Sequence, residues 1–244
     1  MWQHCGQELA QSLISINGVE LRRPLGQRLM SIMLSASAII LAGGQSRRMG
    51  RPKAALIFGN CTVLERLITE LRDSFDDILV IAAPAQSEPF PIEHLLRTAP
   101  SSVRLLRDRT SYQGAAVALA RGLAAAANDV AFICSCDLPL LQAEVVRALY
   151  GMLNGYEAVI PHIGGKPQPL CAVYRRKVAA VIETQLASGE RRLTRIAANL
   201  NAYRPAELQL RQIDHELLSF VNINTPEDYS RALAIKQSLE RKNY

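Results

Sequence analysis

The sequence lacks the features typical of nucleic-acid-binding and membrane proteins. Aromatic residues make up only 5% of its 244 residues, and it has no long block of Lys or Arg, so it offers little material for binding nucleic acid. No apolar run approaches the ~20 residues needed to span a bilayer. The net charge of +6 is better explained by a phosphate-rich small ligand. Neither a nucleic acid nor a membrane is expected as a partner.

Cysteine is scarce, and its spacing excludes common cysteine sites. The five cysteines are odd in number, and Cys134 and Cys136 are separated by one residue rather than the two of a C-x-x-C zinc or redox pair. Most of the cysteines fall in apolar stretches that predict core strands. We therefore expect buried, reduced thiols and a cytoplasmic location.

The sequence also lacks the two commonest phosphate-binding motifs, although it contains a glycine loop. An apolar run that ends at Leu41 is followed by a loop of glycines and cations: Gly43, Gly44, Arg47, Arg48, Gly50, Arg51 and Lys53. Gly50 precedes Arg51 rather than Lys and Ser or Thr, which excludes a Walker A loop, and the glycine spacing excludes a Rossmann fingerprint. The pattern still predicts a buried strand leading into a loop whose N–H groups can approach a polyphosphate.

Strand and helix patterns alternate along the chain, which predicts an α/β fold: a single Rossmann-like domain with a mostly parallel central sheet flanked by helices. Strands are expected at 36–41, 78–83, 103–106, 130–134, 158–161, 170–174, 209–213 and through 221–224. Helices are expected at 63–75, 114–127, 176–187, 193–200 and 226–236. Ligands of open α/β sheets bind at the carboxyl ends of the strands, so Gly43 and Asp137 are expected to meet there.

One domain is expected, over residues 36–244, because the chain has no internal repeats and no second class of composition. Residues 1–35 lack a sustained helical or strand period, and they contain neither a continuous apolar h-region nor an A-x-A cleavage site. Such a segment cannot readily bury enough surface to offset the entropy lost on ordering. We therefore expect a poorly ordered extension or an over-called start, and assign it no function.

Four motifs, in order, resemble those of the MobA-like nucleotidyltransferases over about residues 36 to 234. They are LAGGQSRRMGRPK at 41–53, CDLP at 136–139, GERR at 189–192 and FVNINTPE at 220–227. The resemblance implies the nucleotide-diphospho-sugar transferase type of fold. It also implies a Mg²⁺-dependent enzyme that moves GMP from GTP to the molybdopterin cofactor and releases pyrophosphate. Molybdenum-insertion or molybdoenzyme chaperone proteins are implied as partners.

The chemistry expected of this family needs a metal ligand and cations for the phosphates. Asp137 is the candidate metal ligand, because Mg²⁺ favours one or two carboxylates together with phosphate oxygens and water. The alternative for Asp137 is an Asx turn or a helix N-cap before Pro139. Lys53 and Arg48 are the candidate catalytic cations. No nucleophilic triad is present, which fits an acceptor phosphomonoester that is already ionised.

The resemblance implies further binding residues. Backbone groups of Leu41, Ala42, Gly43 and Gly44 would contact the base and phosphates, Asp108 would help to hold the nucleotide, and Arg191, Arg192, Asn222 and Asn224 would line the acceptor side. Asp108 fits a solvent-exposed turn equally well. Asn222 and Asn224 alternate on an expected strand, so both would point to the same face. The segment Gly114–Ala118 departs from the family's Gly-Pro-Leu-Ala-Gly, which bears on the identity of the acceptor.

Two alternative functions stay open. A cytidylyltransferase of the same fold is one, but Leu-Ala-Gly-Gly resembles guanine-specific members and Leu-Ala-Ala-Gly cytosine-specific ones, so Gly43 favours guanine. A non-catalytic nucleotide-binding regulator is the other. It predicts loss of Lys53 or Asp137, and the sequence keeps both.

Overall fold

The computed structural model describes residues 14–16, 19–21, 33–43, 49–84, 92–97, 99–108 and 113–242. The chain forms two compact units, Met1–Ile32 and Met33–Tyr244. In the first unit, β1 (Ile14–Ile16) and β2 (Val19–Leu21) pair as antiparallel strands. Most of the N-terminal extension lies outside the described residues, so the expectation of poor order stays a prediction.

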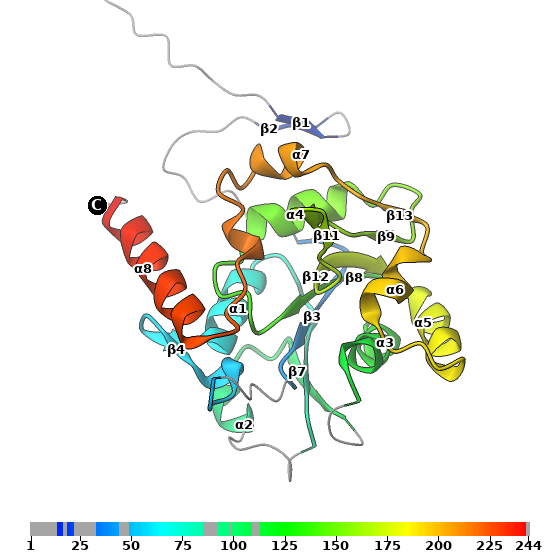
Figure 1. Ribbon diagram of the computed structural model, residues 1–244, viewed down its shortest axis with the longest axis horizontal. Helices are drawn as coiled ribbons and strands as arrows, with labels where there is room; N and C mark the ends of the chain where they lie inside the picture. Colours follow the sequence, from blue (N-terminus) through cyan, green and yellow to red (C-terminus); the bar gives the residue numbers. More distant parts are fainter. Residues whose placement is uncertain are drawn as a thin grey trace, which may run out of the picture. The chain divides into compact units, whose positions relative to one another are not determined.

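A seven-stranded sheet forms the centre of the second unit (Figure 1). Its strands, in spatial order, are β13 (Ala202–Tyr203), β9 (Ala158–Val159), β12 (Cys171–Arg175), β8 (Val130–Ser135), β3 (Ser37–Leu41), β6 (Ile78–Ala82) and β7 (Val103–Arg107). β12 is antiparallel to both of its neighbours, and the remaining neighbouring pairs are parallel. The predicted α/β fold with a mostly parallel sheet is confirmed.

Helices cover both faces of this sheet. Successive side chains of β3 point to opposite faces, so Ile40 packs into one core and Ile39 and Leu41 into the other. The first core is closed mainly by α1 (Val63–Leu71) and α4 (Ala143–Gly151), and the second by α3 (Ala115–Ala125), α5 (Val178–Ala187) and α6 (Leu193–Ala198) (Figure 1). Burial on both faces explains why β3, β6 and β8 are almost continuously apolar.

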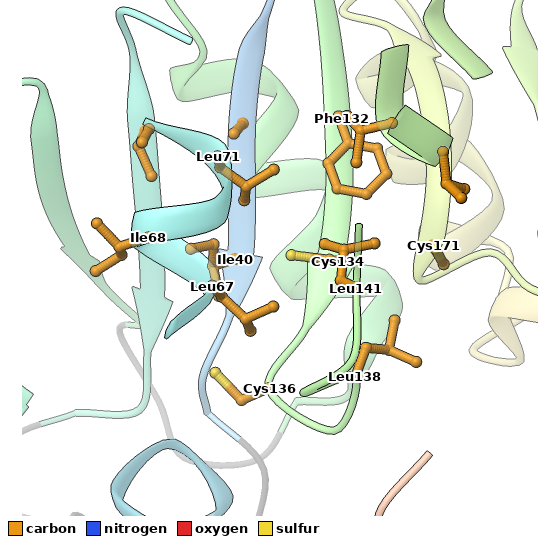
Figure 2. Close-up of a cluster of buried hydrophobic side chains, with 14 of the residues drawn as sticks. Ile40, Leu67, Ile68, Leu71, Phe132, Cys134, Cys136, Leu138, Leu141 and Cys171 are labelled. Carbon is orange, nitrogen blue, oxygen red and sulfur yellow. The ribbon is translucent and has the colours of Figure 1, made fainter. Parts of the chain in front are cut away.

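Figure 2 shows the first core, where Leu67 and Leu71 of α1 lie near Ile40, beside Phe132 and Cys134 of β8. The core contains three buried free thiols, Cys134, Cys136 and Cys171. Burial raises the pKa of each of these thiols well above its ordinary value. They are therefore protonated and act as small apolar side chains in the packing.

Two helices that bear on the site begin with side-chain caps. At the start of α1, the Thr62 hydroxyl accepts a bond from Glu65 N, and the Glu65 carboxylate accepts one from Thr62 N. At the start of α8 (Pro226–Lys242), Thr225 Oγ1 accepts from Asp228 N at 3.2 Å. Thr225 therefore caps this helix, and α8 runs six residues beyond the predicted end at 236.

Two predictions of strands are wrong. Residues 209–213 contribute to a helix, α7 (Glu207–Arg211), because Leu210 and Ile213 are three residues apart and both face the first core. An ion pair of 2.8 Å between Glu207 and Arg211, one helical turn apart, supports the same helix. The strand expected through 221–224 is absent too: a 3-10 turn, η3 (Leu218–Phe220), is followed by irregular backbone.

Several short elements were not predicted. They are η1 (Lys53–Ala55), the hairpin β4 (Ile57–Phe58) with β5 (Cys61–Thr62), the hairpin β10 (His162–Ile163) with β11 (Lys166–Pro167), strand β13 and helix α4. A further short helix is α2 (Ile92–Leu95). Among the described residues, no helix is both long and apolar enough to cross a membrane.

Candidate active site

Three loops leave the carboxyl edge of the parallel strands side by side. The backbone N–H of Ala42 donates to Ile81 O at 2.8 Å, that of Cys136 donates to Leu41 O at 3.1 Å, and that of Asp108 donates to Ala82 O at 2.8 Å. These bonds continue the strand pairing by one residue past each strand end. The segments that begin at Ala42, Asp108 and Cys136 are thereby brought to one edge of the sheet.

Gly43 lies where the first loop passes close to the next strand. A Cβ atom built on Gly43 would lie 3.1 Å from Ala83 N, so any side chain here would press on the backbone after β6. Leu41, Ala42 and Gly43 are at the edge where the sequence places them. Gly44 and Arg48 lie outside the described residues, so their predicted roles stay predictions.

Lys53 and Asp137 come together across 84 positions of sequence. Lys53 is the first residue of η1, and its Nζ lies 3.5 Å from Asp137 Oδ2. Asp137 follows β8 by two residues, and its Oδ1 accepts a hydrogen bond from the hydroxyl of Ser135. The two side chains are 19% and 21% exposed, so the pair can be reached by a ligand yet is largely shielded from water. Asp137 is not the N-cap of α4, which is Gln142.

The segment before α8 (Pro226–Lys242) contacts both Lys53 and Asp137. Lys53 Nζ donates to Asn224 Oδ1 at 2.7 Å, and Ile223 N donates to Asp137 O at 2.9 Å. Asp228 Oδ2 in turn accepts from the backbone N–H of Asn224, which lowers the pKa of the Asp228 carboxyl. Sequence-distant residues therefore hold both the side chain of Lys53 and the backbone of Asp137.

An arginine of α1 holds the loop that follows Asp137. Arg66 Nε donates to Pro139 O at 2.6 Å, and Glu70, which lies 3.6 Å from Arg66, accepts from the backbone N–H of Ala143 at 2.8 Å. α1 thus fixes both the loop and the start of α4. Arg66, Glu70 and Ser135 were not predicted; Ser135 stands two residues before Asp137, but nothing local in the sequence relates Arg66 to a loop 73 positions away.

Asp108 is not the solvent-exposed turn acid that was the alternative to a binding role. Its side chain is 13% exposed, and its Oδ1 accepts from Arg121 of α3 at 2.6 Å. Arg121 also donates to Arg107 O. Gly114, just before α3, has a φ of +96°, a backbone conformation that favours glycine. This explains why the segment Gly114–Ala118 shares the first glycine of the family's Gly-Pro-Leu-Ala-Gly although it differs elsewhere.

The residues predicted for the acceptor side lie in two parts of the chain. Asn222 donates to Phe220 O at 3.3 Å, and the strand on which it was predicted to alternate with Asn224 is absent, so the predicted strand is wrong and the role of the pair stays a prediction. Arg191 and Arg192 are exposed between α5 and α6, and Arg192 lies 3.6 Å from Glu190 of the same turn.

A metal at this site would depend on a single protein carboxylate. No group of three His, Cys, Asp or Glu side chains among the described residues is arranged to hold a metal ion. Mg²⁺ needs no such group, because it commonly binds through one or two carboxylates with phosphate oxygens and water completing its shell. Asp137, with one oxygen fixed by Ser135 and the other turned toward a flexible lysine, fits that mode of binding.

Comparisons with known proteins agree with this geometry. The model of the MobA-like NTP transferase domain matches residues 38–205. The chain is 32% identical to the molybdenum cofactor guanylyltransferase of Desulfosudis oleivorans over 83% of this chain and 96% of that protein, and 34% identical to a probable one from Methanosarcina acetivorans over 80% and 88%.

A solved structure gives the same fold. The molybdopterin-guanine dinucleotide biosynthesis protein A of Archaeoglobus fulgidus superposes with a TM-score of 0.70 at 24% identity, covering 83% of this chain and 99% of that one. The matched segment contains the Gly43 loop, Lys53, Asp108 and Asp137, which the fold gathers at one edge of the sheet. The chain belongs to the MobA-like NTP transferase family.

Proposed function

We propose that this protein transfers GMP from GTP to the phosphate of molybdopterin, forming the guanine dinucleotide cofactor and releasing pyrophosphate. The observation that carries the proposal is the pair of Lys53 and Asp137, 3.5 Å apart at the carboxyl edge of the sheet. A cation for phosphates and a carboxylate for a divalent metal are the two charged groups that this chemistry requires. The two named relatives support the choice of substrates, because each covers at least four fifths of this chain.

Each residue has a defined part in the proposed reaction. The backbone of Leu41, Ala42, Gly43 and Gly44 would receive the base and phosphates, with Asp108 also holding the nucleotide and Arg48 and Lys53 contributing positive charge. Asp137 would hold Mg²⁺, which supplies charge neutralisation at the α-phosphate when bound. Arg191, Arg192, Asn222 and Asn224 would face the acceptor. The acceptor phosphate is ionised at neutral pH, so no residue has to remove a proton.

Gly43 supports guanine over cytosine as the donor base. Cytosine-specific members resemble Leu-Ala-Ala-Gly, which would place a methyl group at this position. In this structure that methyl would lie 3.1 Å from Ala83 N, closer than most side-chain contacts. The loop path found here therefore fits a glycine, and with it the guanine-specific pattern.

The test is a direct product analysis. The purified protein is incubated with Mg²⁺, molybdopterin and each of GTP, CTP, ATP and UTP in separate reactions, and the dinucleotide products are identified by mass spectrometry. We expect the guanine dinucleotide to dominate. Preferential formation of the cytosine dinucleotide would overturn the donor assignment, and absence of any product would favour a nucleotide-binding regulator. We propose as well that the protein acts in the cytoplasm and that its partners are molybdenum-insertion or molybdoenzyme chaperone proteins.

A further inference from the structure

The ammonium group of Lys53 lies at the oxygen that a metal ion would use. Ser135 donates to Oδ1 of Asp137, and Lys53 faces Oδ2 at 3.5 Å. Two cations that share one carboxylate repel each other, and the repulsion is strong where the side chains are only about one fifth exposed. In this arrangement Lys53 neutralises Asp137 and opposes the binding of a divalent cation.

We propose that Lys53 is a counter-ion switch: without nucleotide it neutralises Asp137, and a bound triphosphate draws it away, which makes the carboxylate available to the metal. The proposal deepens the proposed function, and it rests on that function only in taking a nucleoside triphosphate and a divalent cation as the ligands. It assigns Lys53 a second task besides contact with phosphate, namely to make metal binding depend on nucleotide.

Asn224 provides the anchor that this switch requires. Its Oδ1 accepts from Lys53 at 2.7 Å, a shorter contact than that between Lys53 and Asp137. The amide is neutral and exposed, so a charged phosphate can replace it as the partner of the ammonium at small cost. The lysine side chain has a flexible four-carbon stem and three donors, which suits it to exchange partners within the site.

Asp137 itself is held firmly while Lys53 can move. Its main-chain oxygen accepts from Ile223 N at 2.9 Å, and the loop after it is bound by Arg66 at Pro139 O. Ser135 fixes the rotation of its carboxylate. The carboxylate therefore stays in place in either state, and the position of the lysine determines whether its charge is already compensated.

The consequence is a measurable coupling between sites. Coupling between ligands is commonly 5- to 150-fold in affinity, and by linkage it is reciprocal. Replacing Lys53 with a neutral residue removes the competing cation, so metal alone binds the variant more tightly than it binds the wild type. A lysine that served only to support the fold would give the opposite result, or no change.

The test measures Mn²⁺ binding by EPR titration of the full-length protein with no nucleotide present. The variants are Lys53→Met, Lys53→Gln, Lys53→Arg, Asp137→Asn and the double variant Lys53→Met/Asp137→Asn. Lys177→Met is the matched control, because Lys177 also lies 3.5 Å from a carboxylate, that of Glu157, in a pair outside the site. Thermal melting confirms that each variant is folded.

We expect Lys53→Met and Lys53→Gln to bind Mn²⁺ tighter than the wild type by roughly 5- to 150-fold. Lys53→Arg and Lys177→Met should stay within about twofold of it, since neither alters the charge beside Asp137. Asp137→Asn should lose binding, and the double variant should lose the gain. Unchanged or weaker binding by both neutral Lys53 variants, or a gain that survives in the double variant, would overturn the switch. Lack of guanylyl transfer alongside the expected Mn²⁺ affinities would overturn the proposed function and leave the switch standing.

Discussion

Asp77 ties together three segments at the amino edge of the sheet, and its removal gives the sharpest stability prediction. Its side chain is 8% exposed. Oδ2 accepts from Ser37 Oγ at 2.6 Å and from Ala127 N at 2.9 Å, and Oδ1 accepts from Arg104 Nε and Nη2 at 2.8 and 2.6 Å. The carboxylate therefore joins the start of β3, a strand residue of β7 and the turn after α3.

The cost of Asp77→Ala follows from what is left unpaired. The hydroxyl of Ser37, which is fully buried, loses its acceptor, at ~1–3 kcal/mol for an unpaired buried group. Ala127 is exposed, so its N–H can bond water instead. Arg104 is half exposed, so it regains water and adds little. We expect a loss of about 2 kcal/mol in unfolding free energy, which for a domain of this size lowers the melting temperature by about 4–8 °C.

Urea denaturation followed by circular dichroism measures the loss, with Asp76→Ala as the control. Asp76 is the adjacent residue and is exposed, so its removal should change stability by less than ~0.5 kcal/mol. Transfer activity at 25 °C should be preserved in folded Asp77→Ala, because Asp77 lies at the edge opposite the candidate site. A loss below ~1 kcal/mol, or one equal to that of Asp76→Ala, would refute the reasoning.

Three further predictions concern the helices and the N-terminal unit. Gly122→Val should destabilise the domain by ~1–3 kcal/mol in urea melts, because a Cβ there would lie 2.8 Å from Ile39 Cγ2, and wild-type stability would show that α3 can shift. The pKa of the Asp228 carboxyl is lowered in the folded protein, chiefly because the Asn224 N–H donates to it. The carboxylate therefore stabilises the start of α8 above its ordinary pKa near ~3.9, and this stabilisation is lost as the pH falls through the lower pKa of the folded state. The protection factors of the amides in the first turn of α8, which are corrected for the intrinsic exchange rate at each pH, should therefore fall on acidification in the wild type and change little in Asp228→Asn, and equal pH dependence of the two would contradict this. Deleting residues 1–32 should leave melting temperature and GTP turnover unchanged, and a large drop in either would show that the segment packs on the domain or covers the site.

The fold could be predicted because its main strands are buried on both faces. A run such as 130–134 is apolar throughout, and no amphipathic helix gives that pattern. α1 could be predicted because its five buried positions fall on one helical face behind a Thr–Glu capping box. Both patterns lie within a short segment of the chain, so they can be recognised in a single sequence without knowledge of tertiary contacts.

The errors occur where tertiary contacts decide. Residues 209–213 have enough apolar alternation to suggest a strand, but Leu210 and Ile213 both pack against the first core, and the segment forms the end of α7 and the turn after it. The Asn222–Asn224 segment looks extended, yet its shape is set by contacts with Asp137 and Lys53, which are more than 80 positions away. No local pattern encodes those contacts.

The candidate site likewise contains residues that local motifs predict and residues that only tertiary contacts reveal. Gly43, Lys53, Asp108 and Asp137 could be proposed from the motifs, because each stands next to a recognisable strand end or loop. The residues that hold them, Ser135, Arg66 and Arg121, could not. Arg66 and Arg121 appear in the sequence as ordinary charged residues of amphipathic helices, and only the packing of α1 and α3 on the sheet reveals their partners.

The proposed role of Asp137 in guanylyl transfer can be measured with radiolabelled GTP. Wild type and Asp137→Asn, each in excess over the label, are mixed with GTP labelled at the α-phosphate, Mg²⁺ and molybdopterin, and the label in the dinucleotide is followed with time. We expect transfer of the label by the wild type and a rate at least roughly a hundredfold lower for the folded variant, because the amide ligates Mg²⁺ weakly and adds no negative charge. A folded Asp137→Asn protein with a near-normal rate would contradict it.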